Sequence, residues 1–172
     1  MGGILIEDET GYLFVKGSTL GEWGSAKVKT NMKISNIYGI YKTATDEEMS
    51  QIHVEFVEDI NSIKIVSENA TFNITDVALN NLLANPESYV CQPIRLTNID
   101  VTNTVWSYYI GSGNQEIALV PGFGVTIPTR GTFEGYYGND GTKGFIIPSA
   151  EHVTATAYST LIELKNAYET EA

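Results

Sequence analysis

The chain has 172 residues, a hydrophobic content of 42% and a net charge of −11, from 21 acidic and 10 basic residues. This hydrophobic content excludes a disordered chain, and the length suffices for one large domain or two small ones. The acidic residues are spread over both halves, which disfavours nucleic acid and anionic membranes as partners, because both are bound largely through Lys and Arg. The 10 Tyr and 16 Gly favour a mostly β protein.

Cys91 is the single cysteine, which excludes an internal disulfide and a cysteine metal site. It follows Tyr89 and Val90, where a small buried apolar residue is expected. No segment is long and apolar enough to span a bilayer, and the N-terminal residues do not predict a secretion signal.

Residues Gly3–Gly17 predict a β-hairpin. Two apolar runs, Ile4–Ile6 and Tyr12–Val15, flank the sequence Glu-Asp-Glu-Thr-Gly, which has the composition of a turn. A weaker copy of this pattern is found at Ser107–Gly122.

The segment Lys27–Tyr41 alternates with period two and predicts a half-buried strand, bent near Asn36 where the phase slips. Two shorter strands are expected at Gln51–Val57 and Ser62–Val66. The first half of the chain is therefore a hairpin, a long bent strand and closing strands.

At Asp76–Ala84 the apolar residues no longer alternate with period two but form a one-sided stripe. A short helix is expected there, capped by Thr75 or Asp76 and ended by Asn85 and Pro86. It is followed by Pro93–Thr102, which predicts a strand with a bulge midway.

The long strand has a counterpart after the second hairpin, because Ser35–Tyr41 and Gly131–Tyr137 share an apolar residue, Gly and Tyr at the same spacing. The pattern predicts an imperfect tandem repeat. Its parts are a first unit at 1–74, a second unit with a leading helix at 75–157, and a C-terminal helix at 158–172. The second unit has a leading strand, Pro93–Thr102, for which the first unit offers no equivalent.

Units made of a hairpin, a long bent strand, closing strands and a short helix suggest the OB-fold. Three sequence motifs resemble those of a known OB-fold family. Ile4–Val15, ILIEDETGYLFV, resembles the hairpin motif fxIqDetGgIyv of OB-fold modules in surface lipoproteins of anaerobic gut bacteria, a family labelled nucleic-acid-binding lipoproteins. Leu82–Thr97 resembles their pExyxgkxVrl segment, and the C-terminal TLIELKNAYE resembles the helix that opens such modules.

The resemblance implies a mostly β protein with two OB-fold-like five-stranded Greek-key barrels in tandem, joined to short helices. The first barrel is expected to lack its opening strand. It also implies a place in the cell envelope, periplasmic or surface-exposed, although the chain departs from the family in having no cysteine near its start to carry a lipid.

No catalytic, metal or cofactor site is expected. The run Glu7-Asp8-Glu9 reads as a solvated turn, because three adjacent residues at a strand end cannot all face one ion. The histidines His53 and His152 stand outside any motif for metal ligation or nucleophilic catalysis.

Aromatic residues provide the functional candidates, because OB-folds bind oligonucleotides or oligosaccharides on a sheet face and its adjoining loops. Because side chains alternate between the two faces of a strand, about half of these rings are expected to lie in the core. The acidic charge favours a neutral glycan or a protein as the partner of this non-catalytic binding or scaffold module. The candidate residues are Trp106, Tyr108, Tyr136, Tyr137 and Trp23.

An alternative is single-stranded nucleic-acid binding, which requires a local basic groove and predicts a strong salt dependence. The candidate groove residues are Lys27, Lys29, Lys33 and Lys42. Separately, the open first barrel predicts completion by the C-terminal segment, by a second chain in an oligomer, or not at all.

Overall fold

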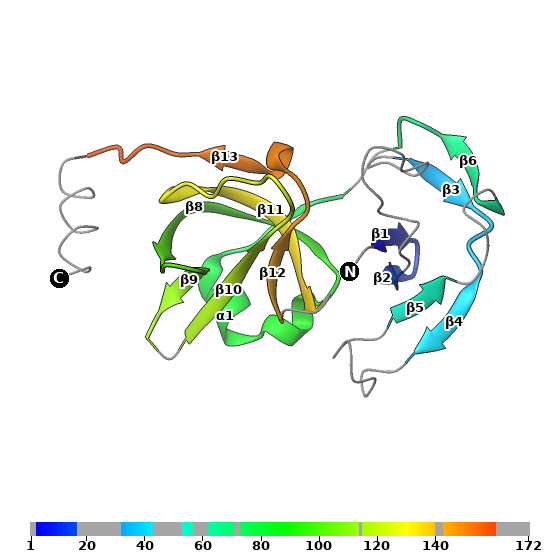
Figure 1. Cartoon of the computed structure of the whole chain (residues 1–172), viewed down its shortest axis with the longest axis horizontal. Coiled ribbons are helices and arrows are strands. Elements are labelled where there is room, and N and C mark those ends of the chain that lie inside the picture. The colour runs from blue at the N-terminus through cyan, green and yellow to red at the C-terminus, as the bar shows by residue number, and fades with distance from the viewer. Residues whose placement is uncertain are drawn as a thin grey trace. The chain divides into compact units, whose positions relative to one another are not determined.

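The computed structural model describes residues 3–16, 32–42, 53–56, 62–70, 73–113, 115–139 and 143–160. They are mostly β-strand, which confirms the predicted class (Figure 1). The chain divides into two units: unit 1 is Met1–Asn73 with Gly138–Lys143, and unit 2 is Ile74–Tyr137 with Gly144–Ala172. No helix in the described part of the chain is long and apolar enough to cross a membrane.

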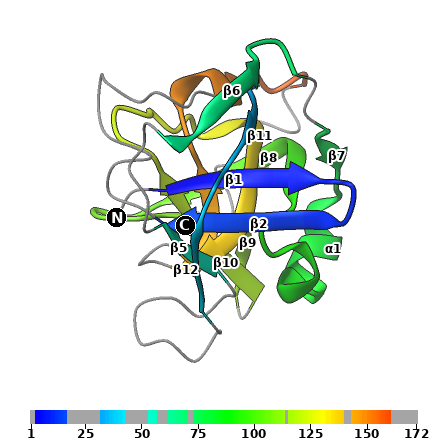
Figure 2. The ribbon, with the colours of Figure 1, turned by 90° about the vertical axis from the view of Figure 1, so that its right-hand side faces the viewer.

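Unit 1 begins with the predicted hairpin, formed by β1 (Gly3–Asp8) and β2 (Gly11–Lys16), onto which Figure 2 looks. Strand β2 pairs in parallel with β5 (His53–Phe56), which pairs antiparallel with β4 (Gly39–Lys42). These strands form a four-stranded sheet in the order β1-β2-β5-β4.

Asp8 builds the hairpin turn. Its Oδ1 accepts hydrogen bonds from the Thr10 amide at 2.7 Å, from the Thr10 hydroxyl, and from the Gly11 amide at 3.2 Å. This Asx turn leaves Gly11 at φ 147°, a conformation that favours glycine. The hydroxyl and amide of Thr10 lower the pKa of the Asp8 carboxyl below 3.8.

Asp8→Asn is therefore expected to destabilise unit 1 in a pH-dependent way. The folded state favours the Asp8 carboxylate, so its stabilisation is present above pH 3.8 and is lost as the pH falls through the lowered native pKa. Urea midpoints at neutral pH should differ between wild type and variant, and should converge in strongly acidic buffer.

Glu9→Gln is the matched control, since it removes the same charge from the same exposed turn. An equal loss of stability in both variants would show that net charge, rather than the Asx turn, sets the effect.

The described part of the predicted long strand, residues 32–41, forms two strands. Asn36 has a φ of 62° and separates β3 (Lys33–Ser35) from β4, and β3 pairs antiparallel with β6 (Lys64–Ser67). The bend near Asn36 is thus where the sequence predicted it. Among the described residues of unit 1, Val15 and Ile63 are buried in one cluster, and four half-buried residues pack against them, Ile4, Ile6, Ile34 and Ile37.

In unit 2 the predicted helix is shorter than expected. Helix α1 covers Leu79–Ala84, its N-cap is Ala78 and no side chain caps it, so the predicted cap by Thr75 or Asp76 is wrong. Those two residues form β7 (Thr75–Asp76), which pairs in parallel with β8 (Pro93–Asn103), and the 3-10 helix η2 (Pro86–Tyr89) follows α1.

Together with β7 and β8, the five remaining strands of unit 2 form a seven-stranded sheet in the order β13-β11-β12-β10-β9-β8-β7. Because β11 also pairs with β8, the sheet curls into a partial ring. The strands not yet placed are β9 (Tyr108–Ser112), β10 (Gln115–Pro121), β11 (Arg130–Asn139), β12 (Lys143–Ile147) and β13 (Val153–Ala155), the last preceded by the 3-10 helix η3 (Ala150–His152).

The predicted bulge of β8 is present. Asn98 has a φ of 57°, and the β8–β11 register shifts between Gly131 and Phe133. The strand then contributes to both of its neighbours, β9 and β11. Its inward residues join the core of unit 2, whose most buried members include Leu82, Ile94, Leu96, Ile110, Phe133, Phe145 and Ile147. Cys91 is buried, as expected.

The strand pairings of unit 2 repeat those of unit 1. Strands β9 and β10 form an antiparallel hairpin like β1 and β2, and β10 pairs in parallel with β12 as β2 does with β5. Strand β11 pairs antiparallel with β13 as β3 does with β6. Strand β8 is the exception, since the described residues of unit 1 contain no strand in its place.

Candidate functional site

The turn between β8 and β9, Thr104–Ser107, is the best-defined exposed feature of unit 2. The Thr104 amide and hydroxyl donate to the Ser107 carbonyl oxygen at 2.8 and 3.0 Å, and the Ser107 amide donates to Thr104 Oγ1 at 3.1 Å. These hydrogen bonds close the turn at its base. The two residues between them, Val105 and Trp106, are therefore held at the tip.

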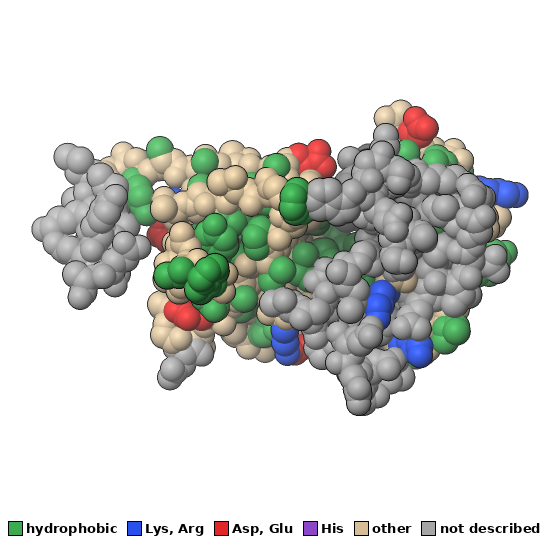
Figure 3. Space-filling view, in the orientation of Figure 1, with side chains coloured by type: hydrophobic (Ala, Val, Ile, Leu, Met, Phe, Trp, Pro, Cys, Tyr) green, Lys and Arg blue, Asp and Glu red, His purple; other side chains and the backbone are tan. Residues whose placement is uncertain are grey.

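Trp106 is 92% exposed and Val105 is 84% exposed. Figure 3 shows hydrophobic side chains gathered over β9 and β10 on this face of unit 2. An exposed apolar pair on a hydrogen-bonded turn loses little conformational freedom on binding, because the backbone is already ordered. Trp is also enriched among the residues that dominate binding energy.

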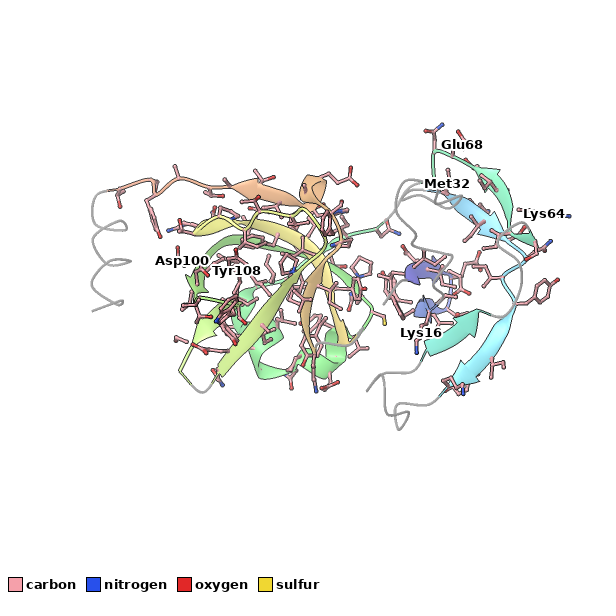
Figure 4. The ribbon with its side chains drawn as sticks, in the orientation of Figure 1. Lys16, Met32, Lys64, Glu68, Asp100 and Tyr108 are labelled. Carbon is pink, nitrogen blue, oxygen red and sulfur yellow. The ribbon has the colours of Figure 1, made fainter. Side chains whose placement is uncertain are left out.

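Tyr108 lies at the base of this turn, where β9 begins and where it pairs with Asn103 of β8 (Figure 4). Its ring is half-buried and packs against the core of unit 2. It therefore links the exposed turn to the sheet, and the structure brings it into the same region as Trp106.

Tyr136 and Tyr137 are core residues, with exposed fractions of 7% and 5%. This burial corrects their prediction as ligand contacts. Tyr136 lies opposite Pro93 of β8, and Tyr137 bridges to Val90, so both are covered at the place where the ring closes. Trp23 lies outside the described residues.

The two predicted lysines that the structure describes lie on different strands. Lys33 is exposed on β3, whereas Lys42 is half-buried at the end of β4, and these strands pair with β6 and β5 respectively. The break at Asn36 lies between them. Lys27 and Lys29 lie outside the described residues.

The two arginines among the described residues are bound to carboxylates. Arg95 donates from Nε to Glu134 Oε1 at 2.8 Å and from Nη1 to Asp76 Oδ1 at 3.2 Å, and these bonds, the one to Glu134 foremost, raise the pKa of Arg95. Arg130 lies 3.7 Å from Asp100 and stacks over the ring of Tyr158. Each guanidinium thus has a carboxylate within 4 Å.

Ser149, Glu151 and His152 form a local hydrogen-bonded cluster. Ser149 Oγ lies 2.8 Å from His152 Nδ1 and 3.2 Å from Glu151 Oε1. A catalytic triad requires the histidine between the nucleophile and the acid, whereas here the serine lies between the other two. The His152 amide also donates to the Ser149 carbonyl, so the three side chains lie together on one 3-10 turn.

Within the described ranges no group of three or more His, Cys, Asp or Glu residues could hold a metal ion. The side chain of His53 is outside the described part of the chain. Sequence reasoning missed Val105 and Phe123, which is 82% exposed in the loop after β10. The available signal was that each is a large apolar residue in a segment of turn composition.

Comparison with protein-family models, with curated proteins and with solved structures finds no match for this chain. The class defined by the structure is a mostly β protein whose seven-stranded sheet is partly ring-like.

Proposed function

We propose that this protein is a non-catalytic binding module built from OB-fold-like units, which contacts a glycan or a protein through the turn that carries Val105 and Trp106. The assignment to the OB-fold is supported by the circuit β8-β9-β10-β12-β11, in which β10 and β12 are parallel and β11 returns to β8. That circuit suits a five-stranded, partly open Greek-key barrel.

Trp106 is the observation that carries the proposal. Burying its ring on a partner removes a large apolar surface from water. The turn that carries the ring is already closed by the hydrogen bond between Thr104 and Ser107 before a partner binds. The loop between the first two strands of the circuit is also where OB-folds bind their ligands. The proposal also places the protein in the cell envelope, on the ground that Ile4–Val15 resembles the hairpin motif of the surface lipoproteins.

Nucleic-acid binding is the second candidate and has less support. The net charge is −11, both described arginines are paired, and the lysines on β3 and β4 are separated by Asn36. Binding through phosphates would weaken steeply with added salt. Binding through Trp106 would change little with salt.

Trp106→Ala is expected to weaken ligand binding about 10- to 30-fold, the loss of a central hot-spot residue. The measurement is a titration of wild type and variant at two salt concentrations against neutral and acidic oligosaccharides, and against short single-stranded DNA and RNA. Tyr41→Ala is the matched control, because Tyr41 is an aromatic residue of unit 1 with 59% exposure. Salt-sensitive DNA or RNA binding, unchanged in Trp106→Ala, would contradict the proposal.

A further inference from the structure

Exposed polar side chains lie beside the turn that carries Trp106. Burial alternates along the last part of β8, and its outward residues there are Asp100, labelled in Figure 4, and Thr102, both exposed. The next two residues, Asn103 and Thr104, are exposed as well. The hairpin therefore offers a carboxylate, two hydroxyl groups and an amide next to the exposed indole ring.

Tyr109 adds a second aromatic ring on the outer face of this hairpin. It follows Tyr108, which packs against the core, and precedes Ile110, which is fully buried, so its own side chain points outward. Tyr109 pairs with Thr102 of β8 and with Ala118 of β10. Because both neighbours are small, the ring is only half-buried.

The spacing of the two rings suits linked sugar units. Trp106 and Tyr109 are three residues apart, so their Cα atoms lie at most about 10 Å apart. Two linked sugar rings span a distance of this size. One face of a sugar ring carries C–H groups, which pack against a flat aromatic side chain.

We infer that the ligand of the Trp106 site is a neutral oligosaccharide, whose rings pack on Trp106 and Tyr109 and whose hydroxyl groups bond to Asp100 and Thr102. This inference rests on the proposed function and names the class of ligand for it. The carboxylate of Asp100 has two acceptor oxygens for sugar hydroxyl groups. Hydrogen bonds to an ionised acceptor are stronger than those between neutral groups.

The exposed apolar area at the turn is small for a protein partner. In the described part of unit 2 the large hydrophobic residues that are exposed are Val105, Trp106 and Phe123, and Phe123 lies in another loop, after β10. One aromatic side chain buries about 150–250 Å², whereas a stable protein interface buries about 800 Å² on each partner. A saccharide requires one or two such rings with hydrogen-bonding groups beside them, which this hairpin provides.

The charge at the site favours a neutral sugar over an acidic one. Arg130 Nη1 lies 3.7 Å from the Asp100 carboxylate, but the Asp100 side chain is 60% exposed and that of Arg130 only 15%. Solvent therefore meets the carboxylate rather than the guanidinium. Glu116 of β10 adds an exposed negative charge to the outer face. A uronate or sulfate group would be repelled there.

The test titrates the full chain by calorimetry with neutral hexasaccharides of glucose, galactose, mannose and xylose. The tightest of these is then compared with the same sugar carrying sulfate groups. At least one neutral hexasaccharide is expected to bind, and its sulfated form should bind about fivefold more weakly or worse. Absence of binding by all four neutral sugars, or equal binding of the sulfated form, would overturn the inference.

Asp100→Asn tests the role of the carboxylate. Asparagine keeps an acceptor oxygen but removes the negative charge, so the ratio of neutral to sulfated affinity should fall about threefold or more. Glu68→Gln removes the same charge from an exposed residue of unit 1 and should leave this ratio unchanged. An equal fall in both variants would assign the preference to net charge and not to Asp100.

Tyr109→Leu tests the second ring. Leucine keeps an apolar side chain for folding but has no flat face, so neutral-sugar binding should weaken about five- to tenfold. Tyr109→Phe restores the flat ring and should recover most of the affinity. Tyr38→Leu is the matched control, since Tyr38 is a tyrosine of unit 1 with 55% exposure. Circular dichroism checks that each variant is folded.

The outcomes separate this inference from the proposed function. Sugar binding that Trp106→Ala weakens but Tyr109→Leu and Asp100→Asn leave unchanged would overturn the roles of Tyr109 and Asp100 and keep the turn as the binding site. Absence of sugar binding, with a protein captured by wild type but not by Trp106→Ala, would overturn the saccharide and keep the proposed function. Sugar binding that is unaffected by Trp106→Ala would overturn both.

Discussion

Phe133→Ala is expected to lower the free energy of unfolding of unit 2 by about 3–5 kcal/mol. Phe133 is fully buried and lies opposite Leu96 where β11 meets β8. Truncation therefore removes apolar contacts and leaves a cavity at the closure of the ring. Urea denaturation followed by circular dichroism measures the loss, and Phe133→Leu, expected to cost under about 1.5 kcal/mol, keeps the result readable if the alanine variant fails to fold.

Ile37→Ala is the matched control in unit 1, because Ile37 has the position of Phe133 in the repeat. It is only half-buried, against Val15 and Ile63. A loss of about 1–2 kcal/mol is expected, at or below the low end for truncation of buried aliphatic residues. Equal losses at both positions would contradict the expectation that the fully buried Phe133 contributes more to stability than the half-buried Ile37.

Gly111→Ala is expected to cost about 2–5 kcal/mol, the second large effect. Gly111 has a φ of +96°, and a Cβ there would lie 2.1 Å from the Gln115 carbonyl oxygen and 3.1 Å from Leu83 Cδ2. The methyl group thus meets both backbone and the packing of α1 on β9. The measurement is the urea midpoint, compared with that of wild type.

Gly113→Ala separates the two causes. Gly113 has a φ of +63°, yet nothing lies within 4 Å of an added Cβ. Its substitution should cost only the strain of a left-handed conformation, about 1–2 kcal/mol. If both glycine variants lost the same stability, the loss at Gly111 would be due to backbone strain alone and not to the steric clash.

The strands and turns of this protein could be predicted because local chemistry determines them. The Asx turn at Asp8 and the alternation in β1 and β2 act over a few residues, and so does the phase slip at Asn36. The helix boundary could not be predicted, because Thr75 and Asp76 pair with β8, a contact distant in sequence. Tertiary pairing overrides the capping preference there.

The candidate site was only partly predictable. Alternation expects one of two neighbouring strand residues to face outward, but both Tyr136 and Tyr137 are buried. Partners on both sides of β11 cover them, and a pattern within one strand does not contain that information. Trp106 was selected as an aromatic residue, whereas its exposure depends on the bonds between Thr104 and Ser107.

Closure of the ring in unit 2 also has a consequence for biosynthesis. Strand β8 ends at Asn103 but pairs with β11, which ends at Asn139. At a synthesis rate of about 5–20 residues per second, β8 waits roughly 2–7 s for that partner. Ile94 and Leu96 are fully buried in the folded protein. During this interval they lie on a strand whose edge is not yet paired with β11. Slow folding or aggregation during synthesis is therefore expected to depend on the interval between the synthesis of β8 and that of β11.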